Sequence, residues 1–292
     1  MAKYDNRFCW SRDNVRLTWR DYPGSAQRPV VVCLHGLTRN ARDFEGVAAR
    51  ISDLGWRVVA VSLRGRGESG HARDAMTYVP LTYAQDLDLL LRAAGVERMV
   101  LIGTSLGGIL TMLLATTHRD QLAGALLNDI GPDLEPEGLA KIHGYVGHVA
   151  SWPSWLMAAR ALRDRFADVY PRWGEADWLT HAKRLCRVAP NGRITFDYDP
   201  RIAEPFRAPG GEKPGVDLWP TLAAFADVPV ASVRGARSDL FSAATQARMA
   251  ERLPQLDVVV VPDVGHAPTL EEPEAWAAIE RLLARVAEHA PA

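Results

Sequence analysis

Residues 100–108, VLIGTSLGG, join a short run of apolar residues to a stretch of helical character. Within them GTSLG, residues 103–107, fits the pattern G-x-S-x-G, and Gly108 follows directly. A serine at a tight strand-to-helix turn takes a strained backbone conformation that raises its hydroxyl above the edge of a sheet. The glycines are needed there because a side chain would collide with the neighbouring strand or helix. We therefore predict that Ser105 is a nucleophile; a serine that only capped the helix would not need three glycines around it.

The surroundings of this stretch indicate the fold class. Short apolar runs, of the kind that strands buried on both faces require, occupy Pro29–Leu34, Trp56–Ser62, Met99–Ile102, Gly124–Asn128, Val228–Val233 and Leu256–Val261. Helical stretches lie between most of them, at Ala41–Leu54, Thr82–Ala94, Ser105–Thr117, Ala243–Leu253 and Pro273–His289. This alternation predicts an α/β fold with a mostly parallel sheet and helices on both faces. Two earlier strands, Arg7–Trp10 and Val15–Arg20, are expected at the edge of the sheet.

One long segment breaks the alternation. Between Pro132 and Pro220 no run typical of a buried strand occurs, and helices are expected at Trp155–Ala167 and Ala176–Val188, followed by the return APGGEKPG. An insertion of this size between two core strands is expected to be a lid over the sheet. We therefore predict a core of residues 1–131 and 221–292, with a helical lid at residues 132–220.

The lid segment holds five of the nine tryptophans, and this suggests an apolar roof over a pocket. Trp152 and Trp155 are candidate pocket residues, which would suit an apolar or aromatic acyl substrate. The alternative is that the tryptophan rings only pack the lid onto the core.

A serine hydroxyl is a weak nucleophile and needs a general base. His266, in PDVGHAPTLEEP, follows the last apolar run and lies in a short loop before the final helix. That position is at the carboxyl edge of the sheet, where Ser105 also emerges and where ligands bind in open α/β sheets. His266 is therefore the predicted base, and His71, in another loop near the sheet edge, is a weaker rival.

A third group should orient the imidazole of the base and stabilise its charged form. Asp239, in VRGARSDLFS, follows the run Val228–Val233, and it precedes His266 in the chain. Asp129, in LLNDIGP, ends the preceding run and is the rival. We predict Asp239 as the acid and keep Asp129 as the alternative. The simpler interpretation of Asp239 is that its side chain only caps the helix that follows.

Acyl transfer also requires backbone N–H groups that bind the oxyanion, each worth about 3 kcal/mol of the barrier. The N–H groups of Leu106 and Leu37 are the candidates, because His35-Gly36-Leu37 follows the first buried strand. Gly36 allows close approach of the backbone. His35 is expected to brace this loop and is a possible pocket residue. Arg39 is either a partner for a substrate carboxylate or a surface arginine.

Composition excludes several classes of partner. Lysine and arginine (34) balance aspartate and glutamate (35), and no long run of one sign occurs, which argues against nucleic acid and membrane surfaces. The start MAKYDNRFCW lacks the pattern of a signal peptide, and no apolar run approaches ~18 residues. Three scattered cysteines without a CxxC pair predict neither disulfides nor a zinc site. We expect a cytoplasmic monomer or homodimer without metal or cofactor.

The stretch GRGESG, residues 65–70, matches the dinucleotide-binding pattern G-x-G-x-x-G. That fingerprint requires a helix that begins at the last glycine. Here the polar stretch HARDAMTYVP follows, without helical periodicity, and it ends in Pro80. Gly65 and Gly67 are therefore interpreted as turn residues.

Five motifs in order, HGLTRN, SLRGRGESG, GTSLGG, RGARSD and GHAPTLEEP, span nearly the whole chain. With them the chain resembles the α/β-hydrolase superfamily, and within it the cap-bearing serine esterases and C–C or enol-lactone hydrolases. The resemblance implies the α/β-hydrolase fold with a helical lid inserted after the sixth strand, and Ser105, Asp239 and His266 as catalytic triad. Relatives commonly carry aspartate where Ser62 stands, a departure expected to concern loop bracing. Haloalkane dehalogenases and epoxide hydrolases use an aspartate nucleophile, so the serine argues against both.

These patterns together predict a serine hydrolase that cleaves a small carboxylic ester through an acyl-enzyme intermediate. A C–C bond hydrolase, a lactone hydrolase and a cofactor-free perhydrolase would use the same three residues and stay open as alternatives. A ligand-binding protein on the same fold, with an idle triad, is the alternative from another class.

Overall fold

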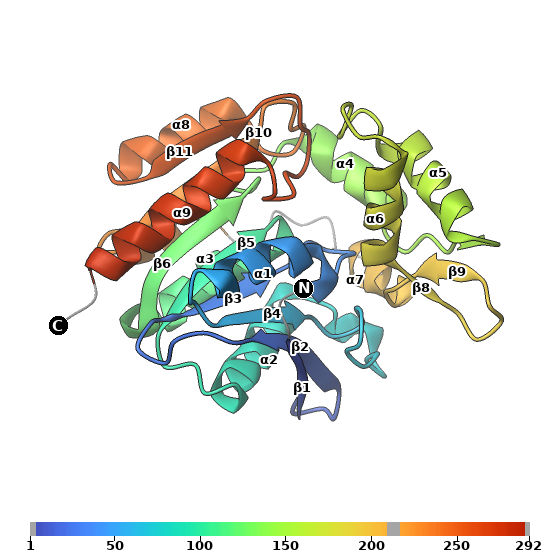
Figure 1. Ribbon diagram of the computed structural model, residues 1–292, viewed down its shortest axis with the longest axis horizontal. Helices are drawn as coiled ribbons and strands as arrows, with labels where there is room; N and C mark the ends of the chain where they lie inside the picture. Colours follow the sequence, from blue (N-terminus) through green and yellow to red (C-terminus); the bar gives the residue numbers. More distant parts are fainter. Residues whose placement is uncertain (1–3, 209–216, 290–292) are drawn as a thin grey trace.

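The structure is a computed structural model that describes residues 4–208 and 217–289. One eight-stranded sheet runs through it in the order β1-β2-β4-β3-β5-β6-β10-β11 (Figure 1). The strands are β1 (Asp5–Trp10), β2 (Arg16–Tyr22), β3 (Val30–Leu34), β4 (Val58–Ser62), β5 (Met99–Thr104), β6 (Leu122–Asn128), β10 (Val230–Gly235) and β11 (Asp257–Val261). The pairs β1–β2 and β2–β4, at one edge, are antiparallel, and the other pairs of this sheet are parallel. The predicted mostly parallel sheet is confirmed.

Helices cover both faces of the sheet, as predicted. Helices α1 (Glu45–Asp53) and α9 (Pro273–Glu288) pack on one face, and α2 (Pro80–Ala93), α3 (Leu106–Thr117) and α8 (Ala243–Arg252) pack on the other. Along β3, Val32 joins the core beside α2 and α3, whereas Val31 and Cys33 join the core beside α1 and α9. Successive side chains of a strand point to opposite faces, so a sheet covered on both sides needs continuous apolar strands.

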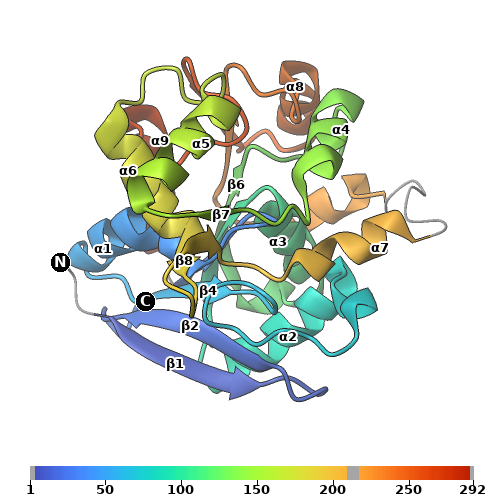
Figure 2. The same cartoon turned by 90° about the vertical axis from the view of Figure 1, so that its right-hand side faces the viewer.

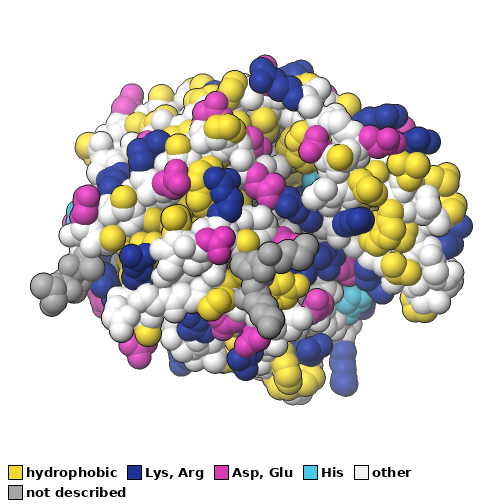
Figure 3. Space-filling model, viewed as in Figure 1, with side chains coloured by type: hydrophobic (Ala, Val, Ile, Leu, Met, Phe, Trp, Pro, Cys, Tyr) yellow, Lys and Arg dark blue, Asp and Glu magenta, His cyan; other side chains and the backbone are white. Residues whose placement is uncertain are grey.

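The insertion follows β6, the sixth strand, as expected. It contains helices α4 (Pro136–Tyr145), α5 (Trp155–Phe166), α6 (Glu175–Leu185) and α7 (Glu204–Arg207). In Figures 1 and 2 helices α5 and α6 lie beside each other, outside the sheet. Figure 3 shows hydrophobic side chains gathered over this end of the molecule, where Val149, Leu156, Met157 and Val188 are exposed.

The lid is not purely helical, which corrects the expectation. A small antiparallel sheet has the order β7-β9-β8, with β7 (Ser151–Trp152), β8 (Cys186–Val188) and β9 (Ile194–Phe196). Residues 186–188, expected at the end of a helix, form β8 because their backbone pairs with β9. The return APGGEKPG lies outside the described residues except for its first alanine, and the lid boundaries at residues 132 and 220 stay a prediction.

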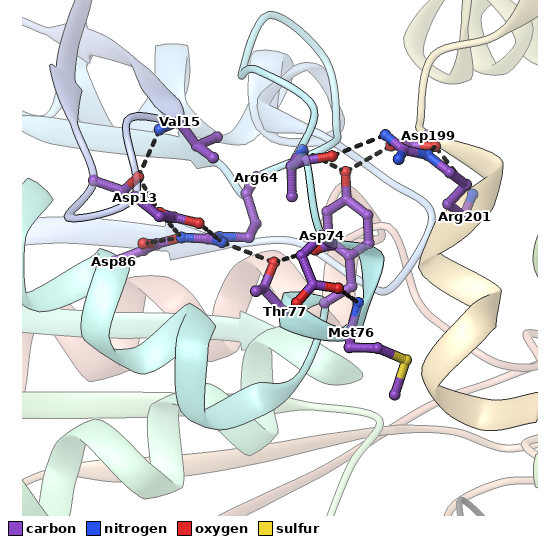
Figure 4. Close-up of polar contacts among 12 residues, drawn as sticks. Asp13, Val15, Arg64, Asp74, Met76, Thr77, Asp86, Asp199 and Arg201 are labelled. Carbon is purple, nitrogen blue, oxygen red and sulfur yellow. Dashed lines mark hydrogen bonds and ion pairs between the residues drawn. The ribbon is translucent and has the colours of Figure 1, made fainter. Parts of the chain in front are cut away.

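A polar network joins the core to the returning end of the lid (Figure 4). The buried Arg64, after β4, forms ion pairs with Asp86 of α2 and with Asp13 of the β1–β2 turn, at 2.6 and 2.8 Å. On the other side of the same loop, the hydroxyl of Tyr78 donates to Asp199 of the lid segment at 2.7 Å. The loop after β4 therefore anchors the lid as well as the sheet edge.

The conformation of the same loop shows whether GRGESG, residues 65–70, is a dinucleotide-binding turn. Gly65 and Gly67 have positive φ angles of 73° and 56°, as turn residues do. No helix begins at Gly70; a short 3-10 helix, Ala75–Thr77, follows instead, and α2 begins only at Pro80. The stretch lacks the helix that would bind a pyrophosphate.

Among the described residues, no helix combines the length and the apolar composition that a membrane-spanning segment needs.

Candidate active site

Ser105 occupies the turn between β5 and α3. Its backbone angles, φ 53° and ψ −116°, lie outside the regions that side-chain-bearing residues favour. A side chain at Gly103 would collide with the backbone of Gly107, and one at Gly107 would collide with the carbonyl of Leu34. Both flanking glycines are therefore required by contacts. The Ser105 hydroxyl makes no capping hydrogen bond to α3, so the plain helix-cap interpretation does not describe this serine.

The Ser105 hydroxyl lies instead against His266, from the loop after β11. Ser105 Oγ is 2.9 Å from Nε2 of His266, and the other ring nitrogen, Nδ1, is 2.7 Å from Oδ2 of Asp129. The Ser105 N–H donates to the carbonyl of Asn128 at 3.0 Å, which ties the turn to the end of β6, where Asp129 follows. The three side chains form one continuous hydrogen-bonded chain.

Asp129 is fully buried and held by several donors. Its Oδ1 accepts the N–H of Gly235 and its Oδ2 accepts the Ser238 hydroxyl, both at 2.7 Å, besides the contact with His266. Its own N–H donates to the carbonyl of Val233 on β10. A buried carboxylate is tolerated only when its oxygens are hydrogen-bonded in this way. The neighbouring strand β10 therefore fixes the orientation of the carboxylate.

Asp239 lies elsewhere, so the prediction that it orients His266 is wrong for this structure. Its carboxylate accepts from Lys141 of the lid helix α4 at 2.6 Å, and its backbone carbonyl accepts from the Gly138 N–H. Ser238, one residue earlier, is the side chain from this loop that turns toward the site, and it contacts Asp129. Both aspartates follow core strands, and their order in the sequence does not reveal which carboxylate turns inward.

The two candidate oxyanion donors come from the start of α3 and from the loop after β3. Leu106 is the first residue of α3, where the helix dipole favours negative charge. Leu37 lines the cavity at Ser105, and a side chain built on Gly36 would lie 3.7 Å from Cβ of Ser105. Within residues 4–208 and 217–289, neither leucine N–H donates to another residue. Their role as oxyanion donors stays a prediction.

His35 braces the candidate oxyanion loop, residues 35–37, and does not line the cavity, so the prediction that it is a pocket residue is wrong. Its Nε2 accepts the Leu63 N–H at 3.0 Å, and its Nδ1 donates to the carbonyl of Gly36 at 2.7 Å. Burial lowers the pKa of His35 to about 4, so the ring is neutral at pH 7. A neutral ring supplies the one acceptor and one donor that these two contacts require.

A cavity of about 110 Å³ opens at Ser105 and His266. Its apolar wall comes from the lid residues Ile142, Tyr145, Phe166, Val169, Tyr170 and Leu185. Trp152 and Trp155 do not line it; Trp152 packs edge-on against Phe196, and both tryptophans pack against the core of the lid. For these two rings the packing alternative is correct.

Arg39 is a partly buried residue of the cavity wall, and not a fully exposed surface arginine. Its Nε and Nη2 bind the two oxygens of Asp43 at 2.5 and 2.8 Å, and Nη1 lies 3.2 Å from Nε2 of His181. Burial alone would lower the pKa of Arg39, but the adjacent Asp43 raises it above its usual value. The charge of Arg39 is thus balanced within the wall, and a substrate carboxylate would have to compete with Asp43.

Sequence reasoning missed His181 of α6 as a residue of the cavity wall. Helix α6 lies against the oxyanion loop, so residues 142 positions apart come into contact. Burial and the charges of Arg39 and Arg184 lower the pKa of His181 well below its usual value. No local pattern around position 181 signals a contact of this kind. In the described parts of the chain, no cluster of three or more side chains suits a metal ion.

Comparison with known proteins identifies relatives along nearly the whole chain. A family model described as "Alpha/beta hydrolase family" matches residues 31–279. A 3-hydroxybutyrate-oligomer hydrolase of Cupriavidus necator is 35% identical over 267 residues, 88% of this chain and 89% of the relative. A 2-(acetamidomethylene)succinate hydrolase of Mesorhizobium japonicum is 29% identical over 84% of each chain. The crystal structure of an alpha/beta hydrolase from Novosphingobium aromaticivorans, 52% identical, superimposes with a TM-score of 0.92 over 98% of this chain and 99% of that one.

Proposed function

Since the chain belongs to the alpha/beta hydrolase family, we propose that it is a serine hydrolase that cleaves small carboxylic esters through an acyl-enzyme intermediate. The observation that carries this proposal is the chain of hydrogen bonds from Ser105 through His266 to Asp129. In that arrangement a base lies within hydrogen-bond reach of the nucleophile and is itself oriented by a carboxylate, as acyl transfer requires.

Each residue has a defined task in this mechanism. Ser105 Oγ attacks the ester carbonyl while Nε2 of His266 takes its proton, and His266 then returns the proton to the leaving alcohol. Asp129 holds Nδ1 protonated and stabilises the imidazolium that forms. The N–H groups of Leu37 and Leu106 receive the oxyanion of the tetrahedral intermediate. Water repeats the sequence on the acyl-enzyme and releases the acid.

The cavity supports a short acyl group. Its volume of about 110 Å³ is smaller than the ~150 Å³ apolar cavity that accommodates benzene. The wall combines aromatic and aliphatic side chains with polar ones, which include Arg39, His181 and Arg184. The relative from Cupriavidus necator is a hydrolase of 3-hydroxybutyrate oligomers, which are esters of a short acid. We therefore place the preferred acyl chain of this enzyme at about four carbons. We also propose that the enzyme is cytoplasmic, needs no metal, and is a monomer or a homodimer.

Hydrolysis of 4-nitrophenyl esters of rising acyl length tests this function. The expected result is a maximum in kcat/KM near the butyrate, a steep decline from the octanoate onward, and loss of turnover in Ser105→Ala. Turnover retained by Ser105→Ala would contradict the serine mechanism. A native protein that folds but hydrolyses no ester in the series would contradict the substrate class and favour the ligand-binding alternative.

A further inference from the structure

His181 is a buried polar side chain in the wall of the catalytic cavity that the proposed mechanism does not use. Its exposed fraction is 4%, and it lines the same cavity as Ser105 and His266. Its ring is surrounded by Tyr170, Trp173 and Trp178, with ring centroids 5.7, 5.0 and 5.8 Å away. Helix α6 thus holds an imidazole in an aromatic cage, in the wall of the cavity that Ser105 also lines.

The contacts of this imidazole leave one of its hydrogen-bonding groups without a partner. Its two nitrogens, Nε2 and Nδ1, lie 3.2 and 3.5 Å from the Nη1 and Nη2 atoms of Arg39, and no other described residue offers a polar partner. A neutral imidazole has one lone pair and one N–H, while a guanidinium carries donors only. Arg39 therefore satisfies the lone pair of His181 and leaves the ring N–H without an acceptor. A buried donor without an acceptor is costly, so a ligand oxygen that accepts from it would bind favourably.

The charges around the cavity indicate what kind of oxygen fits. The two cations that line it within the described residues, Arg39 and Arg184, are both paired, with Asp43 and with Glu271 at 2.5 and 2.8 Å. No unbalanced positive charge is left to attract an anion. A carboxylate would therefore lose its hydration for a single neutral donor, whereas a hydroxyl or an ester carbonyl would not carry that cost.

We propose that the ring N–H of His181 recognises a second, neutral oxygen on the acyl part of the substrate, which makes His181 a residue that determines specificity. The proposal rests on the proposed ester hydrolysis and names its substrate class. The enzyme should prefer short esters whose acyl chain carries a hydroxyl or a further ester group over the corresponding unsubstituted esters. His181 takes no part in the bond changes at Ser105.

The test compares two esters that differ by one hydroxyl, 4-nitrophenyl 3-hydroxybutyrate and 4-nitrophenyl butyrate. We expect the wild-type ratio of kcat/KM values to favour the hydroxybutyrate. In His181→Phe, which keeps an aromatic ring in the cage, that ratio should fall about tenfold, the range of one neutral hydrogen bond. His181→Asn, which keeps an N–H donor, should restore part of the ratio. Lys183→Ala, at an exposed position of the same helix, is the matched control and should leave the ratio unchanged.

Two further outcomes are decisive. Equal losses on both esters in His181→Phe, or no change in the ratio, would overturn the proposal while ester hydrolysis stands. If the wild type hydrolyses neither ester, the proposed function fails separately. In that case calorimetry tests the role of His181. It compares the affinities of Ser105→Ala for methyl 3-hydroxybutyrate and for methyl butyrate. Equal affinities for the two esters would overturn it. Thermal melting of each variant shows whether it is folded.

Discussion

At the residue scale, the site depends on a serine, a histidine and an aspartate from three different loops. Ser105 follows β5, Asp129 follows β6 and His266 follows β11, and these strands all end at the same edge of the sheet. Asp129 reaches His266 because β6 lies beside β5, and the N–H of Gly235 and the hydroxyl of Ser238 fix its carboxylate. The position of the acid on the sheet therefore follows from strand order in space and not from order in the sequence.

Replacing the two candidate acids separates them. Asp129→Asn should lower kcat for 4-nitrophenyl butyrate by about 10⁴-fold, because an amide favours the wrong tautomer of the base. Asp239→Asn removes only the ion pair with Lys141 at the surface of the lid and should change kcat less than threefold. Steady-state kinetics of both variants measures this. The reverse pattern would restore Asp239 as the acid.

His35 should make stability depend on pH. Its pKa is about 4 in the folded protein and ~6.5 in the unfolded chain. As the pH falls below ~6.5 the unfolded chain binds the proton first, so the contribution of His35 is complete above that pH and is lost as the pH falls toward 4. His181, whose pKa is also lowered, acts in the same direction. Urea unfolding should show a free energy that declines between pH 6.5 and 4.

The comparison variant for this effect is His35→Gln, which carries no group that titrates in this range. It should reduce the slope of the free energy of unfolding between pH 6.5 and 5 by up to ~1.4 kcal/mol per pH unit. Equal slopes for the variant and the wild type would mean that folding does not lower the pKa of His35.

At the scale of elements, the turn that carries Ser105 depends on close contact between α3 and β3. A methyl group at position 107 would collide with the carbonyl of Leu34, which is backbone and cannot move aside. Gly107→Ala should therefore lower the free energy of unfolding by about 3 kcal/mol and abolish activity. The matched control is Gly144→Ala in α4, where no described atom beyond the adjacent residues and the helix's own backbone lies within 4 Å of the added carbon. This control should leave stability unchanged or raise it by up to ~1 kcal/mol. Thermal and urea unfolding of both variants test the difference.

The elements of the core were predictable because the buried strands are apolar runs and the helices between them are amphipathic, except α3, which is mainly apolar and buried along most of its length. The lid was less predictable, since β8 forms only through its pairing with β9. The same limit applies within the site. Ser105 and His266 stand in recognisable local sequences, whereas the contacts of Asp129 and His181 join residues more than 100 positions apart. Local patterns do not record such contacts.

At the scale of the whole molecule, the lid is attached to the core beside the cavity. Asn40 and Arg42, at the start of the segment that follows the oxyanion loop, both donate to the carbonyl of Arg184 in the lid, at 3.0 and 3.1 Å. Arg42 also forms an ion pair with the buried Asp197 at 2.6 Å. The oxyanion loop and the lid are therefore positioned by the same few residues, and the shape of the cavity depends on both.

Loosening this attachment should affect stability and substrate binding together. Arg42→Ala leaves Asp197 without its closest partner and should lower the free energy of unfolding by about 1–3 kcal/mol, with a raised KM for 4-nitrophenyl butyrate. Arg187→Ala removes a half-exposed partner of the same carboxylate, 3.3 Å away, and should cost about 1 kcal/mol or less. Urea unfolding and steady-state kinetics of the two variants check this. Equal effects would mean that the Arg42 contact does not hold the lid.

The most direct test of the account is the covalent intermediate itself. The wild type is mixed with 4-nitrophenyl butyrate, quenched in acid during turnover and analysed by peptide mass spectrometry. The predicted result is a butyryl group on the peptide that contains Ser105, absent in Ser105→Ala and accumulating more slowly in Asp129→Asn. Turnover of the ester with no acyl group on any residue, or with the acyl group on another side chain, would contradict the serine mechanism.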